Sequence, residues 1–390
     1  MDKKSLKVTL IGTLPPLKGI SPYCLELTKA ISELIFLEFI GFKDLYPDTF
    51  YPGGTKIISK EHNIQKMNNV SIKEILRYFD PLSWIKTGLI ANGTIIHVQW
   101  WSYVLAPIYI VFLTIFRLRH KKIIITVHNV LPHEINFWGW INIFLNKIVL
   151  LLGHRFIVHS YDNAQKLTNL FGIDQAKISV IPHGILKPTK IRSISKEEAR
   201  DRILVPKKIN VILLFGNLRE YKGLDILLSS LKIVKQKIMN IILIIAGQPW
   251  IEIDGYNNSI RNHNLENNIV RRLKFIPPSE VKYYFSASDV IVLPYKYFDS
   301  QSGVAALSLY FKKPLIVTDV GGLTNFVKDE RAIAKPNDPQ DLARKIIEVL
   351  NDRRLQSKLV HDSKLLNEKY SWDKIAELYV KVYVNLISSK

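Results

Sequence analysis

Short apolar runs alternate along the chain with longer amphipathic segments, and this alternation is the feature that most constrains the fold. Each run is short enough for a buried strand, and the segment after it usually has helical periodicity. The predicted strands are 7–11, 37–42, 94–98, 123–127, 155–158, 178–181, 211–215, 241–246, 290–293 and 315–318. Such alternation predicts an α/β fold with parallel sheets wrapped by helices.

The helical segments complete this pattern. They are 21–34, 71–78, 162–171, 196–203, 225–236, 280–287, 304–311, 339–351, 354–370 and 372–388. Residues 44–69 are polar and poorly periodic, so we expect a long loop with some strand. The alternation breaks at Pro182 and restarts at Val211, which places a linker near 187–193.

The chain length and this break predict two domains. We expect one domain over 1–187 and a second over 188–370. The segments LIGTLPPLKGI (10–20) and LFGNLREYKGL (214–224) resemble each other, since each ends a strand and reaches a Lys-Gly pair before a helix. This suggests two similar domains that face each other, with a cleft suited to a reaction of two substrates.

The composition narrows the classes of partner. With 54 Lys and Arg against 34 Asp and Glu, the net charge of +20 favours nucleic acid, an anionic membrane surface or phosphorylated substrates. No nucleic-acid readout motif accompanies the charge, so we expect no nucleic-acid partner. The single cysteine, Cys24, excludes an internal disulfide and suits a reducing compartment. The polar start of the sequence does not predict a signal peptide.

Two long apolar runs could be membrane spans or buried helices. They are 100–116, which a basic cluster at 117–122 follows, and 135–152. Pro107 and several polar residues interrupt them, and strands flank them, which favours buried or interfacial helices over spans. An apolar face beside a basic cluster would suit docking on anionic lipid, whereas a core helix with a solvated basic end would have the same pattern.

Phosphate-binding features cluster in the second half. Ser302, Gly303 and Val304 begin a helix just beyond the end of a strand, where free N–H groups and the helix dipole favour an anion. An ordinary strand–helix crossover has the same pattern. Arg219 and Lys222 follow another strand and could neutralise a diphosphate, or they could belong to a solvated loop.

A histidine marks the first half. His128 follows the buried strand at 123–127, so it should point into a cleft and contact a substrate, or else cap the strand end. His97 lies within a strand pattern and is better explained as structural. We expect no metal, because the histidines lack a metal-ligand spacing and there is only one cysteine. A dinucleotide cofactor is not expected either, since no GxGxxG is present.

The order of these segments resembles the family 4 glycosyltransferases over nearly the whole chain. FGNLREYKGLDILL, IIAGQPW, FIPPSEVKYYFSASDVIVLPY and SQSGVAALSLYFKKPLIVTDVGGL resemble the donor-binding domain, while ITVHNVLPHE, FIVHSYDNAQKL and VIPHGI resemble the acceptor-binding domain. The resemblance implies a GT-B fold: two facing Rossmann-like domains, with the last helix, 371–390, crossing back to complete the first. It also implies a retaining reaction, a nucleotide-sugar donor and no required metal or cofactor.

The resemblance also assigns roles to residues. His128 and Asp299 would be catalytic, Asn129 and Glu134 would face the acceptor, and Asp289 would be structural. The donor diphosphate would be held by Arg219, Lys222, Gly19, Ser302, Gly303 and Val304.

Two departures from the family pattern leave the nucleotide open. Asp299 and Leu307 stand where the family usually has two glutamates, and Leu307 cannot bind a ribose hydroxyl. Asn217 stands where an arginine often follows the strand-end glycine. The sequence is most similar to the branch of the family with a QSGV motif.

The function expected from this resemblance is hexosyl transfer. A UDP- or GDP-linked sugar would be the donor, and a glycan or lipid-linked molecule the acceptor. The reaction would take place in the cytoplasm, at the inner face of the cell membrane, during assembly of an envelope polysaccharide, glycolipid or glycoprotein. The alternative is a catalytically weak scaffold that binds nucleotide or glycan, which Leu307 favours.

Overall fold

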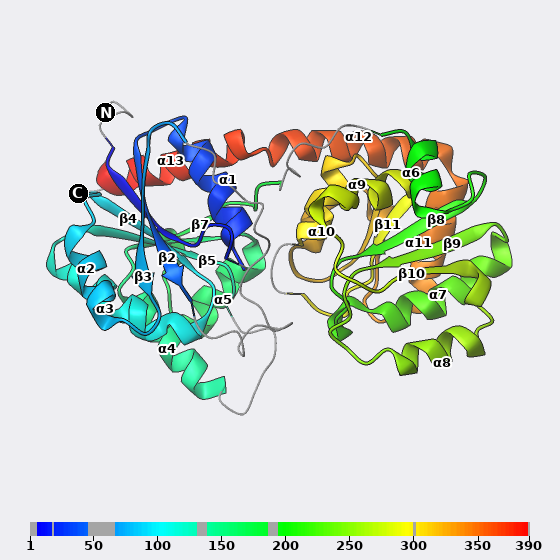
Figure 1. The fold of residues 1–390 in the computed structure, drawn as a ribbon, viewed down its shortest axis with the longest axis horizontal. Coiled ribbons are helices and arrows are strands. Elements are labelled where there is room, and N and C mark those ends of the chain that lie inside the picture. The colour runs from blue at the N-terminus through cyan, green and yellow to red at the C-terminus, as the bar shows by residue number, and fades with distance from the viewer. Residues whose placement is uncertain are drawn as a thin grey trace. The chain divides into compact units, whose positions relative to one another are not determined.

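The computed structural model (Figure 1) describes residues 6–17, 19–45, 67–130, 139–185, 194–298 and 302–388. The chain divides into two compact units. Unit 1 comprises Met1–Gly184 and Tyr370–Lys390, and unit 2 comprises Ile185–Lys369. Each unit is built on one parallel sheet. The expected linker at 187–193 and most of the expected loop at 44–69 lie outside the described residues.

Unit 1 contains a seven-stranded sheet in the order β3-β2-β1-β4-β5-β6-β7. Its strands are β1 (Val8–Gly12), β2 (Leu37–Asp44), β3 (Val70–Arg77), β4 (Ile95–Trp100), β5 (Lys122–Val127), β6 (Arg155–Val158) and β7 (Ile178–Val180). The strand order reverses direction between β1 and β4. Loops on either side of such a reversal diverge and leave room for a ligand at the carboxyl edge of the sheet.

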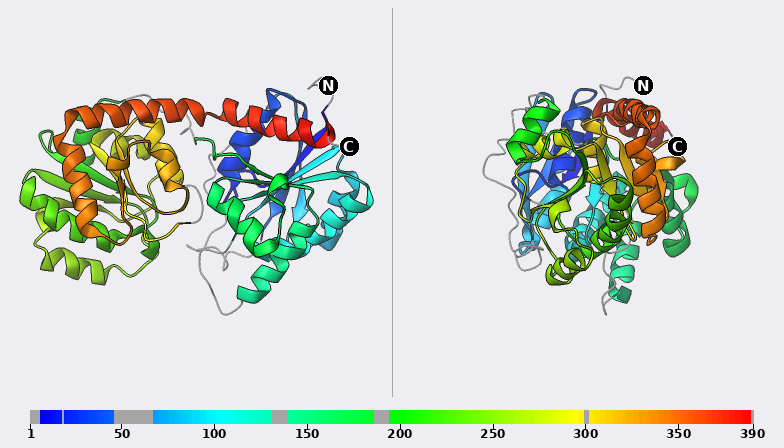
Figure 2. Two further views of the ribbon diagram at one scale, coloured as in Figure 1. Left: turned by 180° about the vertical axis from the view of Figure 1, so that it is seen from behind. Right: turned by 90° about the vertical axis from the view of Figure 1, so that its right-hand side faces the viewer.

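Helices cover both faces of this sheet (Figures 1 and 2). They are α1 (Ser21–Ser32), α2 (Pro81–Ile90), α3 (Ala106–Leu118), α4 (Gly139–Leu151), α5 (Tyr161–Phe171) and α13 (Trp372–Ser388). Helix α13, the last of the chain, packs against α1. The prediction that the final helix returns to the first domain is therefore confirmed.

The helix predicted over 71–78 was wrong, because β3 occupies this segment. Ile72, Ile75 and Leu76 have a spacing that is also compatible with one face of a helix. In the structure the segment pairs in parallel with β2, from Leu37 opposite Val70 onward. Pairing with a neighbouring strand outweighs weak local periodicity, which is common at the edge of a sheet. The following helix α2 was not predicted, although Asp80 caps it and Pro81 opens it.

The apolar run at 100–116 forms the core-facing side of α3 rather than a membrane-docking face. Five of its large apolar side chains are at most 1% exposed, namely Ile108, Tyr109, Phe112, Leu113 and Phe116, whereas Ile110 and Ile115 are partly exposed. Helix α4 contains the described part of the second run. In the described part of the chain, no helix combines the length and the apolar character needed to cross a membrane.

Unit 2 contains a six-stranded sheet in the order β10-β9-β8-β11-β12-β13. Its strands are β8 (Asn210–Phe215), β9 (Ile241–Ala246), β10 (Ile269–Arg272), β11 (Val290–Leu293), β12 (Leu315–Thr318) and β13 (Ile333–Ala334). Its helices are α6 (Lys196–Ile203), α7 (Leu224–Lys237), α8 (Asp254–Asn262), α9 (Pro278–Ala287), α10 (Gly303–Tyr310), α11 (Pro339–Asn351) and α12 (Arg353–Lys369). The strand order here reverses between β8 and β11.

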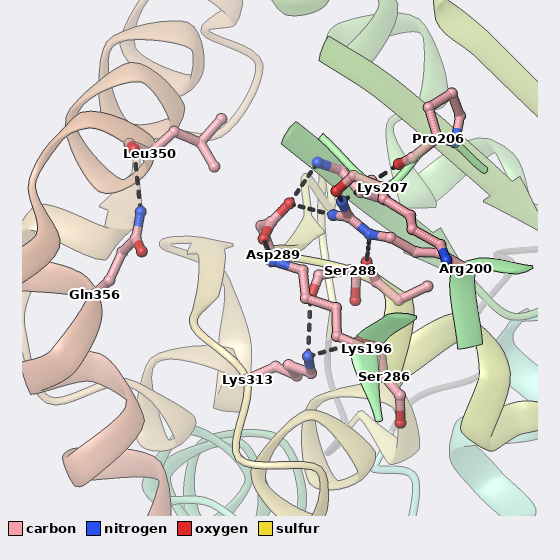
Figure 3. Close-up of polar contacts among 12 residues, drawn as sticks. Lys196, Arg200, Pro206, Lys207, Ser286, Ser288, Asp289, Lys313, Leu350 and Gln356 are labelled. Atoms are coloured by element: carbon pink, nitrogen blue, oxygen red, sulfur yellow. Dashed lines mark hydrogen bonds and ion pairs between the residues drawn. The ribbon is translucent and has the colours of Figure 1, made fainter. Parts of the chain in front are cut away.

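A buried ion pair fastens α6 to the sheet of unit 2 (Figure 3). One carboxylate oxygen of Asp289 accepts hydrogen bonds from Arg200 Nη2 at 2.9 Å and from the Val211 N–H at 2.8 Å. The Arg200 side chain is 2% exposed, and its Nε donates to the Ala287 carbonyl at 3.0 Å. Lys196 pairs with the other oxygen of Asp289. These contacts support the structural role expected for Asp289.

We predict that Asp289→Asn destabilises the protein by about 3 kcal/mol, because it leaves the buried Arg200 guanidinium without its counter-charge. Urea denaturation measures this change. Lys196→Met is the matched control: this lysine is 42% exposed, so its loss should cost less than about 1 kcal/mol. Equal losses in the two variants would contradict a dominant Arg200–Asp289 pair.

Candidate active site

The loops that follow β8 and β11 touch at the point where the strand order reverses in unit 2. Gly223 has φ +67°, and a Cβ at this position would lie 1.9 Å from the Pro294 carbonyl oxygen. Only glycine permits this approach, because any other side chain would overlap the backbone. Gly223 is therefore a packing requirement, and it fixes the position of the short helical turn Glu220–Lys222 that precedes it.

Lys222 is a buried cation in this turn. Its side chain is 7% exposed, and its Nζ lies 5.7 Å from the centre of the Tyr295 ring. Among the described residues, no carboxylate forms an ion pair with it. Burial, followed by repulsion from Arg219, lowers the pKa of Lys222 to about 8.

Arg219 is likewise held by an aromatic ring. Its guanidinium carbon lies 4.2 Å from the centre of the Trp250 ring. The loops after β8 and β9 place the two residues together, since the Trp250 N–H donates to the Leu218 carbonyl and the Leu218 N–H to the Gln248 carbonyl, both at 2.9 Å. An aromatic face attracts a cation without cancelling its charge. The charges of Arg219 and Lys222 thus remain available to an anion.

The N-terminus of α10 lies beside Lys222. A Cβ built on Gly216 would be 3.0 Å from Lys222 Nζ and 3.3 Å from Val304 Cγ2, which places these groups together. Ser302 caps the helix by accepting the Ala305 N–H at 3.3 Å. Within the described residues, the N–H groups of Gly303 and Val304 find no acceptor. These free donors and the two cations form a site suited to a diphosphate.

In unit 1, His128 lies just beyond the end of β5 and is 8% exposed. Its Nε2 lies 2.8 Å from Gln99 Oε1, to which it donates, and its Nδ1 lies 3.3 Å from His159 Nε2. The edge of the Tyr23 ring packs against it, with ring centres 4.8 Å apart. Burial, followed by His159, His183 and His97, holds the pKa of His128 well below its usual value. The imidazole is therefore neutral at physiological pH.

The hydrogen-bond network around His128 extends to the last helix of the chain. Gln99 Nε2 lies 3.1 Å from His97 Nε2, and His97 Nδ1 lies 2.7 Å from the hydroxyl of Tyr383 on α13. His97 is fully buried, and burial lowers its pKa to about 3. The structural role expected for His97 is thus supported. Gln99 and Tyr383 were not singled out from the sequence, where only the strand-end position of Gln99 could have drawn attention to it.

Other predicted residues are placed with less detail. Gly19 has φ +94°, and a Cβ there would meet no atom within 4 Å, so it faces open space. Asn129 Nδ2 donates to the Trp101 carbonyl at 3.2 Å. Asp299 and Glu134 lie outside the described residues. Among the residues that are described, no group of three or more His, Cys, Asp or Glu side chains could hold a metal ion.

Comparison with known families identifies the two halves of the chain. Residues 19–185 match the family described as Glycosyltransferase Family 4, and residues 195–365 match the family described as Glycosyl transferases group 1. The chain belongs to the group 1 glycosyltransferases of family 4. The resemblance found in the sequence motifs is thereby confirmed.

Individual relatives give the same classification. An uncharacterised glycosyltransferase of Methanocaldococcus jannaschii is 29% identical over 230 residues, which cover 56% of this chain and 57% of that protein. A D-inositol 3-phosphate glycosyltransferase of Xylanimonas cellulosilytica is 23% identical over 247 residues, covering 60% of this chain and 58% of that protein. The chain thus spans little more than half the length of these relatives.

A solved structure shares the fold. The HepE protein of Anabaena, crystallised with UDP, has a TM-score of 0.73 at 15% identity, and the match covers 97% of this chain and 100% of that one. The fold is therefore GT-B, with two Rossmann-like domains on parallel sheets, as the resemblance implied.

We predict that Gly223→Ala destabilises the protein by about 3 kcal/mol or more, because the new methyl overlaps the Pro294 carbonyl. Gly172→Ala is the matched control: Gly172 also has φ +67°, but a Cβ there meets no atom within 4 Å. The control should cost only about 1 kcal/mol of backbone strain. Urea denaturation compares the two. Similar losses would show that the close approach of the loops has little energetic importance.

Proposed function

We propose that the protein is a retaining glycosyltransferase that moves a hexose from a UDP- or GDP-linked donor to a glycan or lipid-linked acceptor. The observation that carries this proposal is Lys222, which lies beside the N-terminus of α10 and is close enough to Arg219 for repulsion between the two cations to lower its pKa. Two uncompensated cations and free backbone N–H groups match the charge and geometry of a diphosphate. HepE, which shares the fold, has been crystallised with UDP and with UDP-glucose, and this supports UDP as the nucleotide.

In the proposed reaction, the bond between the anomeric carbon and the diphosphate breaks while the acceptor hydroxyl attacks from the same face. The leaving phosphate takes the hydroxyl proton, so configuration is retained without a covalent intermediate. Lys222, Arg219 and the N–H groups of Gly303 and Val304 stabilise the charge on the leaving group, which is the largest electrostatic need of this step. No metal ion or cofactor is included in the proposal.

His128 and Asp299 are proposed to act on the transferred sugar. The neutral His128 ring can exchange its bond to Gln99 for one to a sugar hydroxyl, because the exchange requires no change of charge. Asp299 supplies a carboxylate for the oxocarbenium-like transition state. Gly19 lets the backbone approach the donor phosphates, and Asn129 and Glu134 contact the acceptor.

The acceptor and the membrane belong to the same proposal. We place the reaction in the cytoplasm, at the inner face of the cell membrane, with peripheral contact to anionic lipid. Since the apolar face of α3 is buried, this contact must come from other residues. Exposed apolar side chains are available at Phe79, beside α2, at Leu82 and Leu89 on α2, and at Phe144 on α4, with exposures of 57–76%. The envelope polysaccharide, glycolipid or glycoprotein assemblies expected from the sequence all provide such an acceptor.

One observation favours a second candidate function, a scaffold that binds nucleotide or glycan with little catalysis. Leu307, on α10, stands where the family usually has a ribose-binding glutamate. A leucine cannot replace those hydrogen bonds. A nucleotide-sugar panel measured by thermal shift tests the donor site, and sugar transfer with the donor found separates an enzyme from a scaffold.

We predict that the affinity for UDP falls as the pH rises, because Lys222 must be protonated to bind a diphosphate. With the pKa of Lys222 near 8 in the free protein, the protonated fraction, and with it the affinity, falls roughly eightfold between pH 7.5 and 9. Isothermal titration calorimetry measures the dissociation constant. In Lys222→Ala, binding should be weak and nearly constant over this range. If the affinity for UDP depends on pH in the same way in both proteins, Lys222 does not bind the donor diphosphate.

We predict that His128→Ala lowers kcat by at least about 100-fold and changes the affinity for UDP by less than about twofold, because His128 acts on the sugar and not on the diphosphate. Transfer is measured with the donor found in the panel. His361→Ala, on the exposed face of α12, should leave both constants unchanged. An unchanged kcat in His128→Ala would exclude a catalytic role for this residue.

A further inference from the structure

A second strongly basic site lies at the opposite edge of the unit 1 sheet from His128. It is a pocket of about 530 Å³ lined by Arg117, His120, Lys121, Lys122 and His154. These residues come from the end of α3, the turn that follows it, the first residue of β5 and the turn before β6. His128 follows the other end of β5, so the two sites are separate.

The lining residues are rich in hydrogen-bond donors and contain no acid. Arginine and lysine side chains can only donate. Within the described part of the chain, Arg117, Lys121 and Lys122 form no ion pair with a carboxylate. Glu38 acts on Lys121 at longer range, but its carboxylate already accepts hydrogen bonds from Lys73 at 2.7 Å and from Thr9. The pocket therefore has an excess of positive charge.

The surroundings of His154 also indicate an excess of positive charge and of hydrogen-bond donors in this pocket. Burial, followed by Arg117, Lys122 and Lys177, lowers the pKa of His154 to about 4, so the ring is neutral. A neutral imidazole has one lone pair. A donor faces each of the two ring nitrogens: the Ile123 N–H lies 3.0 Å from Nδ1, and Arg117 Nη1 lies 2.6 Å from Nε2. One of the two nitrogens must therefore carry a proton that faces another N–H donor. A bound ligand with a hydrogen-bond acceptor would give one of these donors a partner.

We propose that this pocket binds a phosphate-bearing anion. The planar fork of Arg117 and the point charges of Lys121 and Lys122 suit phosphate oxygens, which would supply the missing acceptors. The dipole at the end of α3 accounts for a basic residue in its last turn. It does not explain why a donor faces each of the two ring nitrogens of His154, only one of which can accept a hydrogen bond.

The phosphate can come from two sources. Leu118 and Leu151, close in sequence to the lining residues, are 74% and 67% exposed. Apolar side chains beside cations would suit the headgroup region of an anionic lipid. A free phosphate or diphosphate would use the same cations without the leucines. The chemistry of recognition is shared, so the experiment must separate the sources.

The experiment starts from the Lys222→Ala protein, which removes a cation of the donor site. Its binding to inorganic phosphate and pyrophosphate is measured by calorimetry. Its binding to phosphatidylcholine vesicles with and without phosphatidylglycerol is measured by sedimentation. The test variant adds Lys121→Ser and Lys122→Ser. The matched control adds Lys207→Ser and Lys208→Ser, which removes the same charge from two exposed neighbouring lysines of unit 2.

We expect the test variant to bind at least about tenfold more weakly in one of the two arms, and the control to stay within about twofold. A loss with soluble anions identifies a free phosphate, whereas a loss confined to phosphatidylglycerol vesicles identifies a lipid headgroup. If both variants behave alike in both arms, the pocket is not an anion site. Thermal unfolding of each variant shows whether it is folded, and Arg117→Gln provides a second substitution if the lysine variant is not.

This inference goes beyond the proposed transfer reaction and does not depend on it. Failure of both UDP and GDP to bind the unmodified protein would contradict the proposed function and would leave the result for this pocket unaffected. Equal binding by the Lys121/Lys122 variant and the Lys207/Lys208 control would contradict the proposal for this pocket and would not bear on the Lys222 site.

Discussion

The contact between Gly223 and the Pro294 carbonyl is the constraint on which the donor site depends. It brings together two loops that leave the sheet on either side of the reversal in strand order. One loop carries Arg219 and Lys222, and the other leads to the N-terminus of α10. A side chain at position 223 would force the two loops apart, because its Cβ would lie only 1.9 Å from the carbonyl oxygen. Because charge stabilisation falls quickly with distance and solvent entry, such a separation would weaken the whole site.

The way in which the donor-site cations are held is the second organising feature. A protein usually stabilises a buried cation with a carboxylate, which also cancels its charge. Here Tyr295 and Trp250 offer aromatic faces to Lys222 and Arg219 instead. The site therefore keeps a positive potential. The charged form of Lys222 is destabilised as a result, and its pKa is lowered to about 8. The free protein therefore favours binding of an anion, since a negative charge between Lys222 and Arg219 would offset the repulsion between them.

Much of the fold could be predicted from the sequence, because buried parallel strands are short apolar runs and the helices between them are periodic. The segments 155–158, 196–203 and 290–293 were predicted with their observed bounds. Segment 71–78 failed because its structure is decided by β2, which lies elsewhere in the sequence. The role of Trp250 could not be predicted for a similar reason. Its contact with Arg219 depends on backbone hydrogen bonds between the loops that follow β8 and β9, and these loops are far apart in the sequence. Asp299 and Glu134 remain predictions.

The position of α13 in unit 1 has a consequence for how the protein is made. All strands of the unit 1 sheet have been synthesised by residue 180, but its buried polar network also needs Tyr379 and Tyr383, which follow unit 2 in the sequence. Until then, Tyr23 and His97 lack the partners that cover and bond them. All of unit 2 is translated in the interval and can fold first. Unit 1 therefore completes this network only after unit 2 has been synthesised, and a nascent chain that lacks α13 would expose an unfinished surface to chaperones and proteases.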